Sequence, residues 1–549
     1  MIRIMTRLAA VVLLLQLGTM LYAQQAGEAK SDDPLLRAMQ QEMERSKDRL
    51  KLPDMPVPFY IDYQVSDIDS QSAVATLGAM QNDLHTHMRL LWVVVRVGDY
   101  KQDSFYQRGV GMSDAIPLGD DEMALRHSLW LATDQAYKAA VEALTAKKAR
   151  LKQIATEQPM DDFAQAEPVH FLGPLARLDY DAKTWTDLLK SASALGKRDP
   201  QIEASQVSLE FQAVNRYFVN SEGTVTRRGQ TLYQLVISGS TQASDGMRLE
   251  RGRDYTFSDR KELPTKEELL ARTERALATL KDLRNAPVVE EEYRGPVMMS
   301  GDAATDVFAG LIGENVLGLK PALGEPARTR GAFASSYKTR VLPDFLSVVD
   351  DPGQASLNGQ SLLGFYEVDD QGVKAMRVPV IDKGILVNYV LGRTPIRDFP
   401  TSNGHGRARL GTTSGPSLGN LIVSSSTPLS REELKKKLLE RCKERGLEYG
   451  YFADTLGPPQ RSPRLLYKVW VKDGREELVR GATFGDLDIR SLRSDLIAAG
   501  GDAYVDNQIM NIPHSVVSSS ILFEELEIKR ANKQKDKLPE YPPPVMAAK

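Results

Sequence analysis

A glycine-rich stretch in the second half of the chain, SNGHGRARLGTTSGPSLGN, holds the side chains best suited to bind a ligand. His405 could donate or accept a proton, and Arg407 and Arg409 could grip a carboxylate or a phosphate. The glycines let backbone come close to a bound molecule. The stretch lacks the spacing of a phosphate-binding P-loop and is not framed by a strand and a helix in the required order. It is a candidate substrate-binding loop, and the alternative is a structural β connection whose arginines are structural.

Two pairs of neighbouring carboxylates, Asp350/Asp351 and Asp369/Asp370, could act as an acid and a base if their pKa values were split by proximity. Each pair is followed within two residues by a glycine and lies between apolar strands. Aspartate and glycine in this order are typical of tight turns. We therefore interpret both pairs as turn residues and not as catalytic dyads.

The six histidines and the single cysteine give no metal site. His85 and His87, in HTHMR, would share one face of a strand, but no third ligand is evident. We interpret them as part of an exposed polar face. Cys442 cannot form an internal disulfide and shares an apolar helix face, so we expect a buried small residue and not a nucleophile.

The N-terminus has the pattern of an export signal. Arg3 and Arg7 precede an apolar run from Leu8, and the small residue Ala23 stands at a plausible cleavage point. We predict a signal peptide over residues 1–23 and a periplasmic or secreted protein that has no membrane contact after cleavage. A retained membrane anchor is the alternative, and the run is short for a membrane span of about 20 residues.

The overall charge excludes one class of partner. The chain of 549 residues has 70 Lys and Arg against 73 Asp and Glu, which gives a net charge of −3. No global field therefore attracts nucleic acid or an anionic membrane. Single cores stop growing at roughly 250 to 300 residues, so the length predicts two or more domains.

Composition and turn signals predict four segments after the signal peptide. Residues 24–55 form a polar helical lead-in, residues 56–287 an N-terminal α+β domain, and residues 288–530 a second domain of mostly short strands. Residues 531–549 are charged and proline-rich, so we expect a disordered tail. The fold class is thus α+β, with an N-terminal sheet, long helices and a β-rich C-terminal domain.

Three elements of the N-terminal domain have clear sequence signals. PFYIDYQVSD and MRLLWVVVRVGDY are rich in β-branched and aromatic residues and predict strands. A long helix is predicted from about Asp121 to Lys152, with an apolar face to pack across the sheet. Thr265 and Glu268 form a capping box that starts another helix, and this helix ends before Pro287.

The stretch DAATDVFAGLIGENVLG predicts a helix over residues 302–318. Its apolar face at helical spacing consists of Ala304, Val307, Phe308, Leu311 and Ile312. The neighbouring face holds Ala309, Gly310 and Gly313, which can neither bind a metal nor move a proton. Glycine within a helix costs roughly 1 kcal/mol relative to alanine, so these residues require a packing or functional reason.

Several motifs follow one another in the order and spacing of a known family. They are RGPVMMSGDAATDVFAGLIGENVLG, VVDDPG, FYEVDDQGVKAMRVPVIDKGILVNYVLGR, SNGHGRAR and PSLGNLIV, from about Tyr293 to Ile528. This part of the chain resembles the C-terminal half of the TldD/PmbA family, once called modulators of DNA gyrase. NRYFVNSEG resembles the N-terminal part of the same family.

The resemblance implies a two-domain fold that forms dimers, in which TldD-type subunits are zinc metallopeptidases acting on peptides. Their His-Glu-x-x-x-His helix follows a Gly-Pro-Val strand, and the key positions fall here on Ala309, Gly310 and Glu314. A further cysteine ligand of the family falls near Ala503. The family's metal ligands and its base are thus missing from these positions. PmbA-type subunits also lack the motif and pair with a TldD-type partner.

The leading hypothesis is an exported subunit that has lost the zinc motif and binds peptide or unfolded protein without catalysing its hydrolysis. It predicts no catalytic residue, no metal and no cofactor in this chain, with zinc only in a partner subunit. We expect a dimer, either with itself or with a zinc-bearing TldD-type paralogue. His405, Arg407 and Arg409 are the candidate substrate-binding residues. The alternatives are a hydrolase that uses His405, Arg407 and Glu314, and a stand-alone peptide-binding protein.

Overall fold

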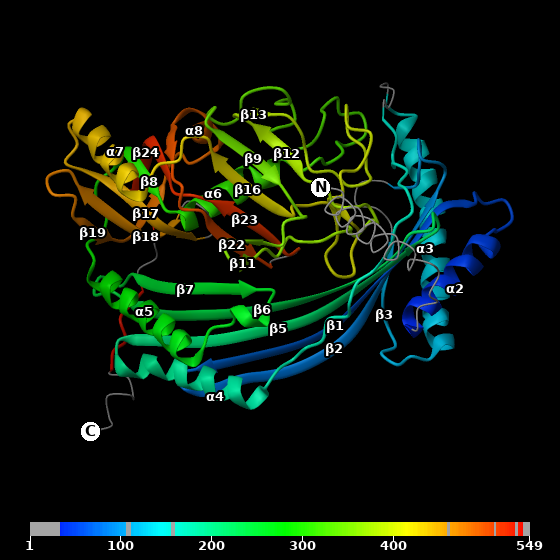
Figure 1. The fold of residues 1–549 in the computed structure, drawn as a ribbon, viewed down its shortest axis with the longest axis horizontal. Coiled ribbons are helices and arrows are strands. Elements are labelled where there is room, and N and C mark those ends of the chain that lie inside the picture. The colour runs from blue at the N-terminus through cyan, green and yellow to red at the C-terminus, as the bar shows by residue number, and fades with distance from the viewer. Residues whose placement is uncertain are drawn as a thin grey trace, which may run out of the picture.

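A computed structural model describes the chain over residues 33–105, 111–154, 160–457, 462–509, 512–532 and 536–541. The predicted signal peptide and its cleavage point, and most of the predicted tail, lie outside these residues. The predicted α+β class is confirmed. A long curved sheet lies under the strands and loops of the C-terminal half (Figure 1).

The first seven-stranded sheet is built from four strands of 18 or 19 residues and three shorter ones, in the order β3-β2-β1-β5-β6-β4, with β7 also paired to β6. The strands are β1 (Pro58–Thr76), β2 (Ala79–Val97), β3 (Gly111–Ile116), β4 (His170–Leu172), β5 (Ile202–Asn220), β6 (Val225–Gln242) and β7 (Arg248–Phe257). The predicted strands are confirmed but extend further, because their polar ends pair in the sheet without an apolar signal.

Four helices cover one face of this sheet. They are α2 (Pro34–Arg49) and α3 (Glu122–Leu151) at one end, and α4 (Ala182–Ser193) and α5 (Lys266–Asn285) at the other. Short 3₁₀ turns, η1 (Ala194–Arg198) and η2 (Arg260–Glu262), follow α4 and precede α5. The predicted long helix is confirmed as α3. Its N-cap is Asp121 and its C-cap is Lys152, which are the predicted ends. The capping box of Thr265 and Glu268 is confirmed at α5.

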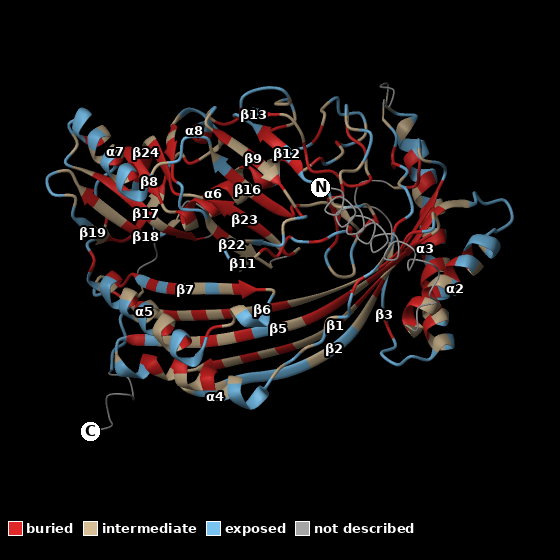
Figure 2. Cartoon of the chain, in the orientation of Figure 1, coloured by how far each residue is buried: buried red, intermediate tan, exposed pale blue. Residues whose placement is uncertain are grey.

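Side chains along β5 alternate between the two faces of the sheet, and those on one face pack against both pairs of helices. Val207, Leu209 and Phe211 join the core that includes α4 and α5. Tyr217 and Val219 join the core that includes α2 and α3. All five have odd numbers, and successive side chains of a strand point to opposite faces. The odd positions of β5 therefore face the helices, and Figure 2 shows the alternating burial along the long strands.

The C-terminal half contains two further large sheets. The seven-stranded one consists of β8 (Tyr293–Met299), β17 (Tyr449–Gly457), β18 (Ser462–Trp470), β19 (Glu476–Val479), β20 (Ala482–Phe484), β21 (Leu496–Ala499) and β24 (Ile521–Arg530). The six-stranded one consists of β9 (Leu346–Asp350), β12 (Val378–Asp382), β13 (Ile385–Leu386), β16 (Asn420–Ser425), β22 (Tyr504–Gln508) and β23 (His514–Ser518). Two-residue ladders are formed by β10 (Ser356–Leu357) with β11 (Gln360–Ser361), and β14 (Gly406–Arg407) with β15 (Gly415–Pro416).

Helices pack on both faces of the second seven-stranded sheet. The helices of this half are α6 (Gly301–Leu311), α7 (Arg431–Glu444) and α8 (Ile489–Ser494), and η3 (Gly313–Asn315) follows α6. Val297 and Met299 of β8 pack in the core with α6, and Met298 between them packs with α7. Cys442 of α7 is fully buried there, as predicted. Burial raises the pKa of its thiol to about 11, so this cysteine is a poor nucleophile.

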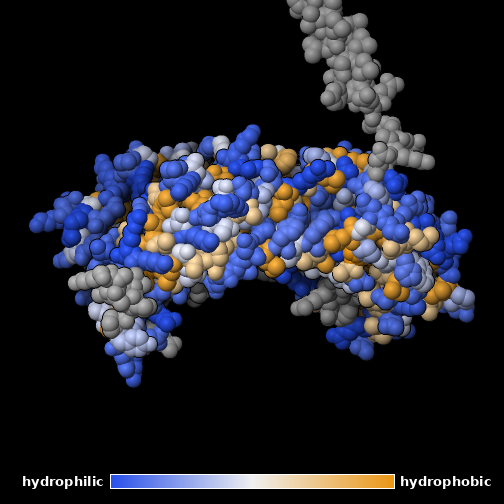
Figure 3. Space-filling view, turned by 90° about the horizontal axis from the view of Figure 1, so that it is seen from below, coloured by the Kyte–Doolittle hydropathy of each residue, from blue (hydrophilic) through white to orange (hydrophobic). Residues whose placement is uncertain are grey.

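The sheet face opposite the four helices meets the C-terminal half through polar contacts. Arg216 of β5 donates to the carbonyl of Ala408 at 3.3 Å. Arg228 of β6, which lies opposite Arg216 in the ladder, forms an ion pair with Asp370. None of the described helices is long and apolar enough to span a membrane. Seen from below, the surface shows apolar side chains in separate patches among hydrophilic ones (Figure 3).

The most buried contact between the halves is an arginine–glutamate pair. Arg393 is fully buried, and its guanidinium donates two hydrogen bonds to Glu222, at 2.6 and 2.7 Å. Its remaining donors reach the carbonyl of Ala164, at 2.9 and 2.8 Å. The hydroxyl of Tyr100 donates to the same glutamate at 2.8 Å. Each guanidinium nitrogen of the fully buried Arg393 thus has a partner, and only 13% of the Glu222 side chain is exposed.

Replacing Glu222 with glutamine should destabilise the protein strongly, because it leaves the buried Arg393 charge without its counter-ion. Breaking a buried ion pair from one side costs on the order of 3 kcal/mol. The measurement is the urea unfolding midpoint of the purified chain. Glu274→Gln is the control, because it breaks the exposed pair with Arg198 and should change stability by about 0.5 kcal/mol or less. Equal effects of the two variants would contradict the role given to Arg393.

Candidate functional site

Buried aspartates from two other segments hold the glycine-rich loop through hydrogen bonds. His405 is fully buried, and its Nε2 lies 3.0 Å from Oδ1 of Asp350, which is also fully buried. The same oxygen accepts the backbone N–H of Gly419 at 3.0 Å. The other ring nitrogen of His405 lies 3.0 Å from the carbonyl of Asn403. The histidine therefore joins the two ends of the loop to the end of β9 and does not face solvent.

The second carboxylate pair holds the middle of the loop. Asp369 accepts backbone N–H groups from Gln371, Val373 and Gly406, at 2.9, 2.8 and 2.7 Å. Burial raises the pKa of Asp369 to about 6, against the opposing effect of these hydrogen bonds. Asp370 accepts from the backbone of the loop and forms an ion pair with Arg228 of the N-terminal sheet. The pairs lie at turns, as predicted, and they also anchor the loop.

Arg407 is also an internal residue. Its guanidinium donates to the carbonyls of Leu418 at 3.2 Å and Pro513 at 2.6 Å, and it lies over the ring of Tyr366. Only 4% of Arg407 is exposed. In the structure His405 and Arg407 are buried, and their polar groups are hydrogen-bonded to other parts of the protein. Arg409 is exposed and is the one predicted substrate-binding residue that a ligand can reach.

The glycines of the loop serve internal packing as well. A Cβ on Gly406 would lie 2.0 Å from Oε1 of Gln371. That same oxygen accepts the backbone N–H of Arg393 at 2.7 Å. Glycine is thus required at this position because the backbone approaches another part of the same protein, and not because it approaches a ligand.

The helix expected over residues 302–318 is shorter in the structure. Ser300 caps α6, which ends at Leu311, and Gly313 begins the following 3₁₀ turn. A Cβ on Gly313 would come within 2.9 Å of the Leu418 side chain, so this glycine lets the turn pack on the glycine-rich loop. The predicted apolar face is buried, except that Leu311 is half-buried.

The residues at the family's metal positions do not fit zinc. Ala309 and Gly310 are half-buried on α6 and carry no donor atom, while Glu314 is exposed beyond the end of the helix. Ala503, near the position of the cysteine ligand, also has no donor. Zinc in proteins is held by three or four nitrogen, sulfur or oxygen ligands. One glutamate cannot replace that set.

The paired histidines of β2 lie on an exposed strand face, as interpreted. Nε2 of His85 lies 2.6 Å from Asp69, and Nε2 of His87 lies 2.8 Å from Asp67, across the β1–β2 ladder. These are two separate cross-strand pairs. Across the described residues, no three histidine, cysteine, aspartate or glutamate side chains are grouped so that they could hold a metal ion.

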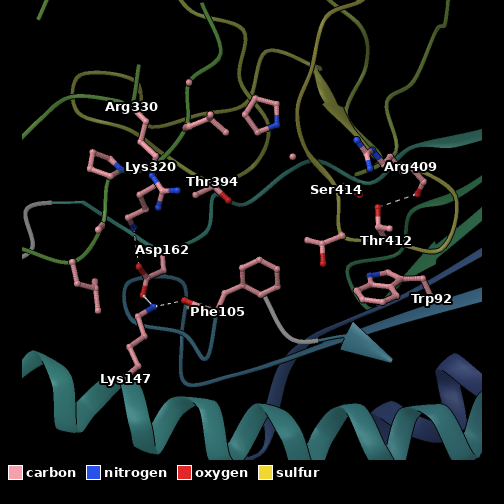
Figure 4. A pocket seen from close by; sticks show the side chains of 18 residues that line it. Trp92, Phe105, Lys147, Asp162, Lys320, Arg330, Thr394, Arg409, Thr412 and Ser414 are labelled. Carbon is pink, nitrogen blue, oxygen red and sulfur yellow. Dashed lines mark hydrogen bonds and ion pairs between the residues drawn. The ribbon is translucent and has the colours of Figure 1, made fainter. Parts of the chain in front are cut away.

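A cavity of about 610 Å³ lies beside the loop, where the two halves of the chain meet (Figure 4). The N-terminal half contributes the side chains Trp92, Phe105, Lys147 and Asp162 to its wall. The C-terminal half contributes two segments and one threonine, namely residues 318–323 with Arg330, residues 409 and 412–416 of the loop, and Thr394. Its volume lies in the range of about 300 to 1,000 Å³ that is usual for small-ligand sites.

The lining of this cavity is cationic. Asp162 pairs with Lys147 at 2.5 Å and with Lys320 at 2.8 Å. Burial opposes the charge of Asp162, but Lys320 and Lys147 outweigh it and lower the pKa of this carboxyl. No described group forms an ion pair or hydrogen bond with the guanidinium of Arg330 or that of Arg409, and both residues are exposed. The cavity therefore has two guanidiniums free to meet an anion.

The aromatic floor has one unsatisfied donor. The indole Nε1 of Trp92 is buried and has no hydrogen-bond acceptor in the structure. In Figure 4 the indole lies below Thr412 and Ser414, and Phe105 lies beside it toward Lys147. The sequence pointed to Arg409 alone. It gave no signal for Trp92 or Arg330, because only the fold brings these distant segments together.

The pH dependence of stability should change when Asp306 of α6 is replaced. Burial first, and then the charges of Asp506 and Asp302, raise the pKa of Asp306 from 3.8 to about 7. Between about pH 4 and pH 7 the folded state therefore holds a proton that the unfolded chain has lost, so the contribution of Asp306 to stability falls as the pH rises. Asp306→Asn should show a smaller decrease in thermal midpoint from pH 5 to pH 8 than the original chain.

The control for this experiment is Asp187→Asn. Asp187 is exposed on α4, and the Lys183 side chain lowers the pKa of its carboxyl. This variant should retain the full decrease between pH 5 and pH 8. A pH profile of Asp306→Asn that matches the original chain would contradict the environment assigned to Asp306.

Comparison with known proteins supports the motif analysis. Residues 292–530 match the family described as the PmbA/TldA metallopeptidase C-terminal domain. No curated protein sequence matches the chain. Among solved structures, the chain is similar to TldE from Thermococcus kodakarensis, with 13% identity, a TM-score of 0.59, and coverage of 89% of this chain and 99% of that one.

Two further structures, both described as candidate modulators of DNA gyrase, are also similar. The one from Thermotoga maritima MSB8 has 15% identity, a TM-score of 0.59, and coverage of 90% of this chain and 99% of that one. The one from Bacteroides thetaiotaomicron VPI-5482 has 13% identity, a TM-score of 0.56, and coverage of 90% and 98%. At sequence identities of 13 to 15%, the structural similarity shows that these proteins share a fold with this chain. Because residues 292–530 match the PmbA/TldA metallopeptidase C-terminal domain, the resemblance of this chain to the TldD/PmbA family is confirmed.

Proposed function

We propose that the protein is a peptide-binding member of this metallopeptidase-related family that does not itself catalyse hydrolysis. The observation that carries the proposal is the chemistry of α6. At the three positions where the family's zinc helix has its ligands and its base, this chain has Ala309, Gly310 and Glu314. Two of the three side chains cannot bind a metal or accept a proton, so the helix serves as packing in the core.

The binding site of this proposal is the cavity beside the glycine-rich loop. This cavity combines free guanidiniums, hydroxyl groups and aromatic rings, and it lies between the two halves of the chain. A few placed polar groups on a largely apolar wall are typical of ligand sites. The N-terminal sequence supports export, so the peptide ligand would be met in the periplasm or outside the cell.

The hydrolase alternative is less well supported. It needs His405 and Arg407 to reach a substrate, but both are buried and held by Asp350 and by backbone carbonyls. A general acid or base must come within hydrogen-bond reach of the proton that it transfers. Glu314 alone remains exposed, and one carboxylate provides neither a metal site nor an acid–base pair.

The purified mature chain, starting at Gln24, should contain no stoichiometric zinc and should not hydrolyse an unfolded protein, with or without a chelator. Zinc content is measured by elemental analysis, and hydrolysis by release of peptides from a denatured substrate. Glu314→Gln is the matched variant and should behave as the original chain. About one zinc per chain together with activity that a chelator or Glu314→Gln abolishes would overturn the proposal.

The proposal also includes a partner, because the family resemblance implies dimers in which zinc lies in a TldD-type subunit. Purification of the tagged chain from its native host should recover a protein with a His-Glu-x-x-x-His helix in a defined ratio. Recombining the two purified chains should then give chelator-sensitive hydrolysis that neither reaches alone. An obligate homodimer that recovers no such protein would contradict the paired arrangement.

A further inference from the structure

We infer that the cavity between the two halves selects acidic peptides, with carboxylates bound by Arg330 and Arg409 and an apolar side chain between them against Trp92. This inference rests on the proposed peptide-binding function and specifies its ligand. The residues that carry it come from three separate segments of the chain.

The charge of the cavity is the first argument. Four cationic side chains and a single carboxylate line it. Lys147 and Lys320 share the carboxylate of Asp162, and Lys147 also lies 3.3 Å from Asp103, so both lysines already have acidic partners. The guanidiniums of Arg330 and Arg409 have no described partner, and they lie on opposite sides of the cavity in Figure 4. Guanidinium groups bind carboxylates through two parallel hydrogen bonds, so each wall is suited to one carboxylate.

The backbone that carries both arginines is held in place. Thr329, next to Arg330, is fully buried and donates to the carbonyls of Leu317 and Leu319 at 3.1 and 3.0 Å. Arg409 follows Ala408, whose N–H donates to Asp370 at 2.8 Å. Positions fixed in this way lose less conformational freedom on binding, which favours affinity.

The rest of the lining favours a peptide over a simple anion. Beside the arginines lie the hydroxyl groups of Thr394 and Thr413, which can donate to a carboxylate or to a peptide carbonyl. The hydroxyl of Thr412 donates to the carbonyl of Arg409 at 3.2 Å. The wall also contains apolar side chains, namely Trp92, Phe105, Leu319, Pro321, Leu323 and Pro416. Apolar surface contributes to binding only when a ligand covers it. A bare phosphate would leave this wall uncovered.

Trp92 gives the cavity part of its aromatic wall, but the indole nitrogen is not exposed to it. Its buried Nε1 has no acceptor in the protein, and a buried donor without a partner is unfavourable. Trp92 lies on β2 opposite Gln64 of β1, whose amide lies 3.4 Å from the hydroxyl of Ser414. The indole is thus part of the contact between the sheet and the loop.

The test uses three labelled hexapeptides of equal length, all with one central phenylalanine. The first carries glutamates and a free C-terminus, the second has glutamines and an amidated C-terminus, and the third carries lysines. Binding to the full mature chain is measured by fluorescence anisotropy. The acidic peptide should bind about 10-fold or more tightly than the glutamine peptide, since each charge-assisted hydrogen bond contributes more than a neutral one. Its affinity should fall as salt is added.

Variants assign the effect to the two arginines. Arg330→Ala and Arg409→Ala should each weaken the acidic peptide about 10-fold and leave the glutamine peptide nearly unchanged. Arg409→Lys should restore only part of the affinity, because lysine keeps the charge but not the paired hydrogen bonds. Arg377→Ala is the control, as an exposed arginine of the same half that lies outside the cavity and near Asp351. Thermal midpoints establish that each variant is folded.

Each outcome has one meaning. Equal binding of the acidic and glutamine peptides, or equal effects of the Arg409 and Arg377 variants, would overturn the acidic selectivity and leave the peptide-binding function in place. Binding of none of the three peptides would overturn both. Displacement of the acidic peptide by millimolar inorganic phosphate to the same extent as by unlabelled peptide would show a simple anion site and would also overturn the inference.

Discussion

Arg393 places a positive charge in the interior between the two halves of the chain. The arrangement of the site depends on the groups that bind and neutralise this charge. Its guanidinium is divided between the carboxylate of Glu222 and the carbonyl of Ala164, both from the N-terminal half. Its backbone N–H is bound by Gln371, beside the carboxylates that hold the glycine-rich loop. A charge in such a place is tolerated only with full compensation, so the halves have little freedom to shift.

The same constraint explains why the sheet has one apolar and one polar face. Helices cover the apolar face, and the other face meets a second folded unit through arginines. Arginine suits this position because its planar group can bind backbone carbonyls and carboxylates at once. The inter-domain cavity lies in this polar contact, and its free guanidiniums belong to the half that the sheet supports.

The glycine-rich loop shows how a binding motif and a structural motif can look alike. Its histidine and first arginine have the chemistry of a catalytic site, but the loop is folded so that both are occupied by protein partners. What reaches solvent is Arg409, two residues further on. Similarly, Gly313 in the 3₁₀ turn η3 that follows α6 serves packing, because it lets the turn lie against Leu418. In both elements, the residue type alone does not show whether a residue binds a ligand or packs inside the protein.

The sequence by itself determined the local features of this protein. The caps of α3 and α5, the strands rich in β-branched residues, the burial of Cys442 and the family resemblance depend on neighbours along the chain or on the order of motifs. Tertiary structure decided which side chains are accessible. His405 and Arg409 differ little in local sequence, yet one is sealed by Asp350 from another strand and the other lines a cavity. The joining of Trp92, Arg330 and Arg409 depends on contacts between segments hundreds of residues apart, and local patterns do not specify such contacts.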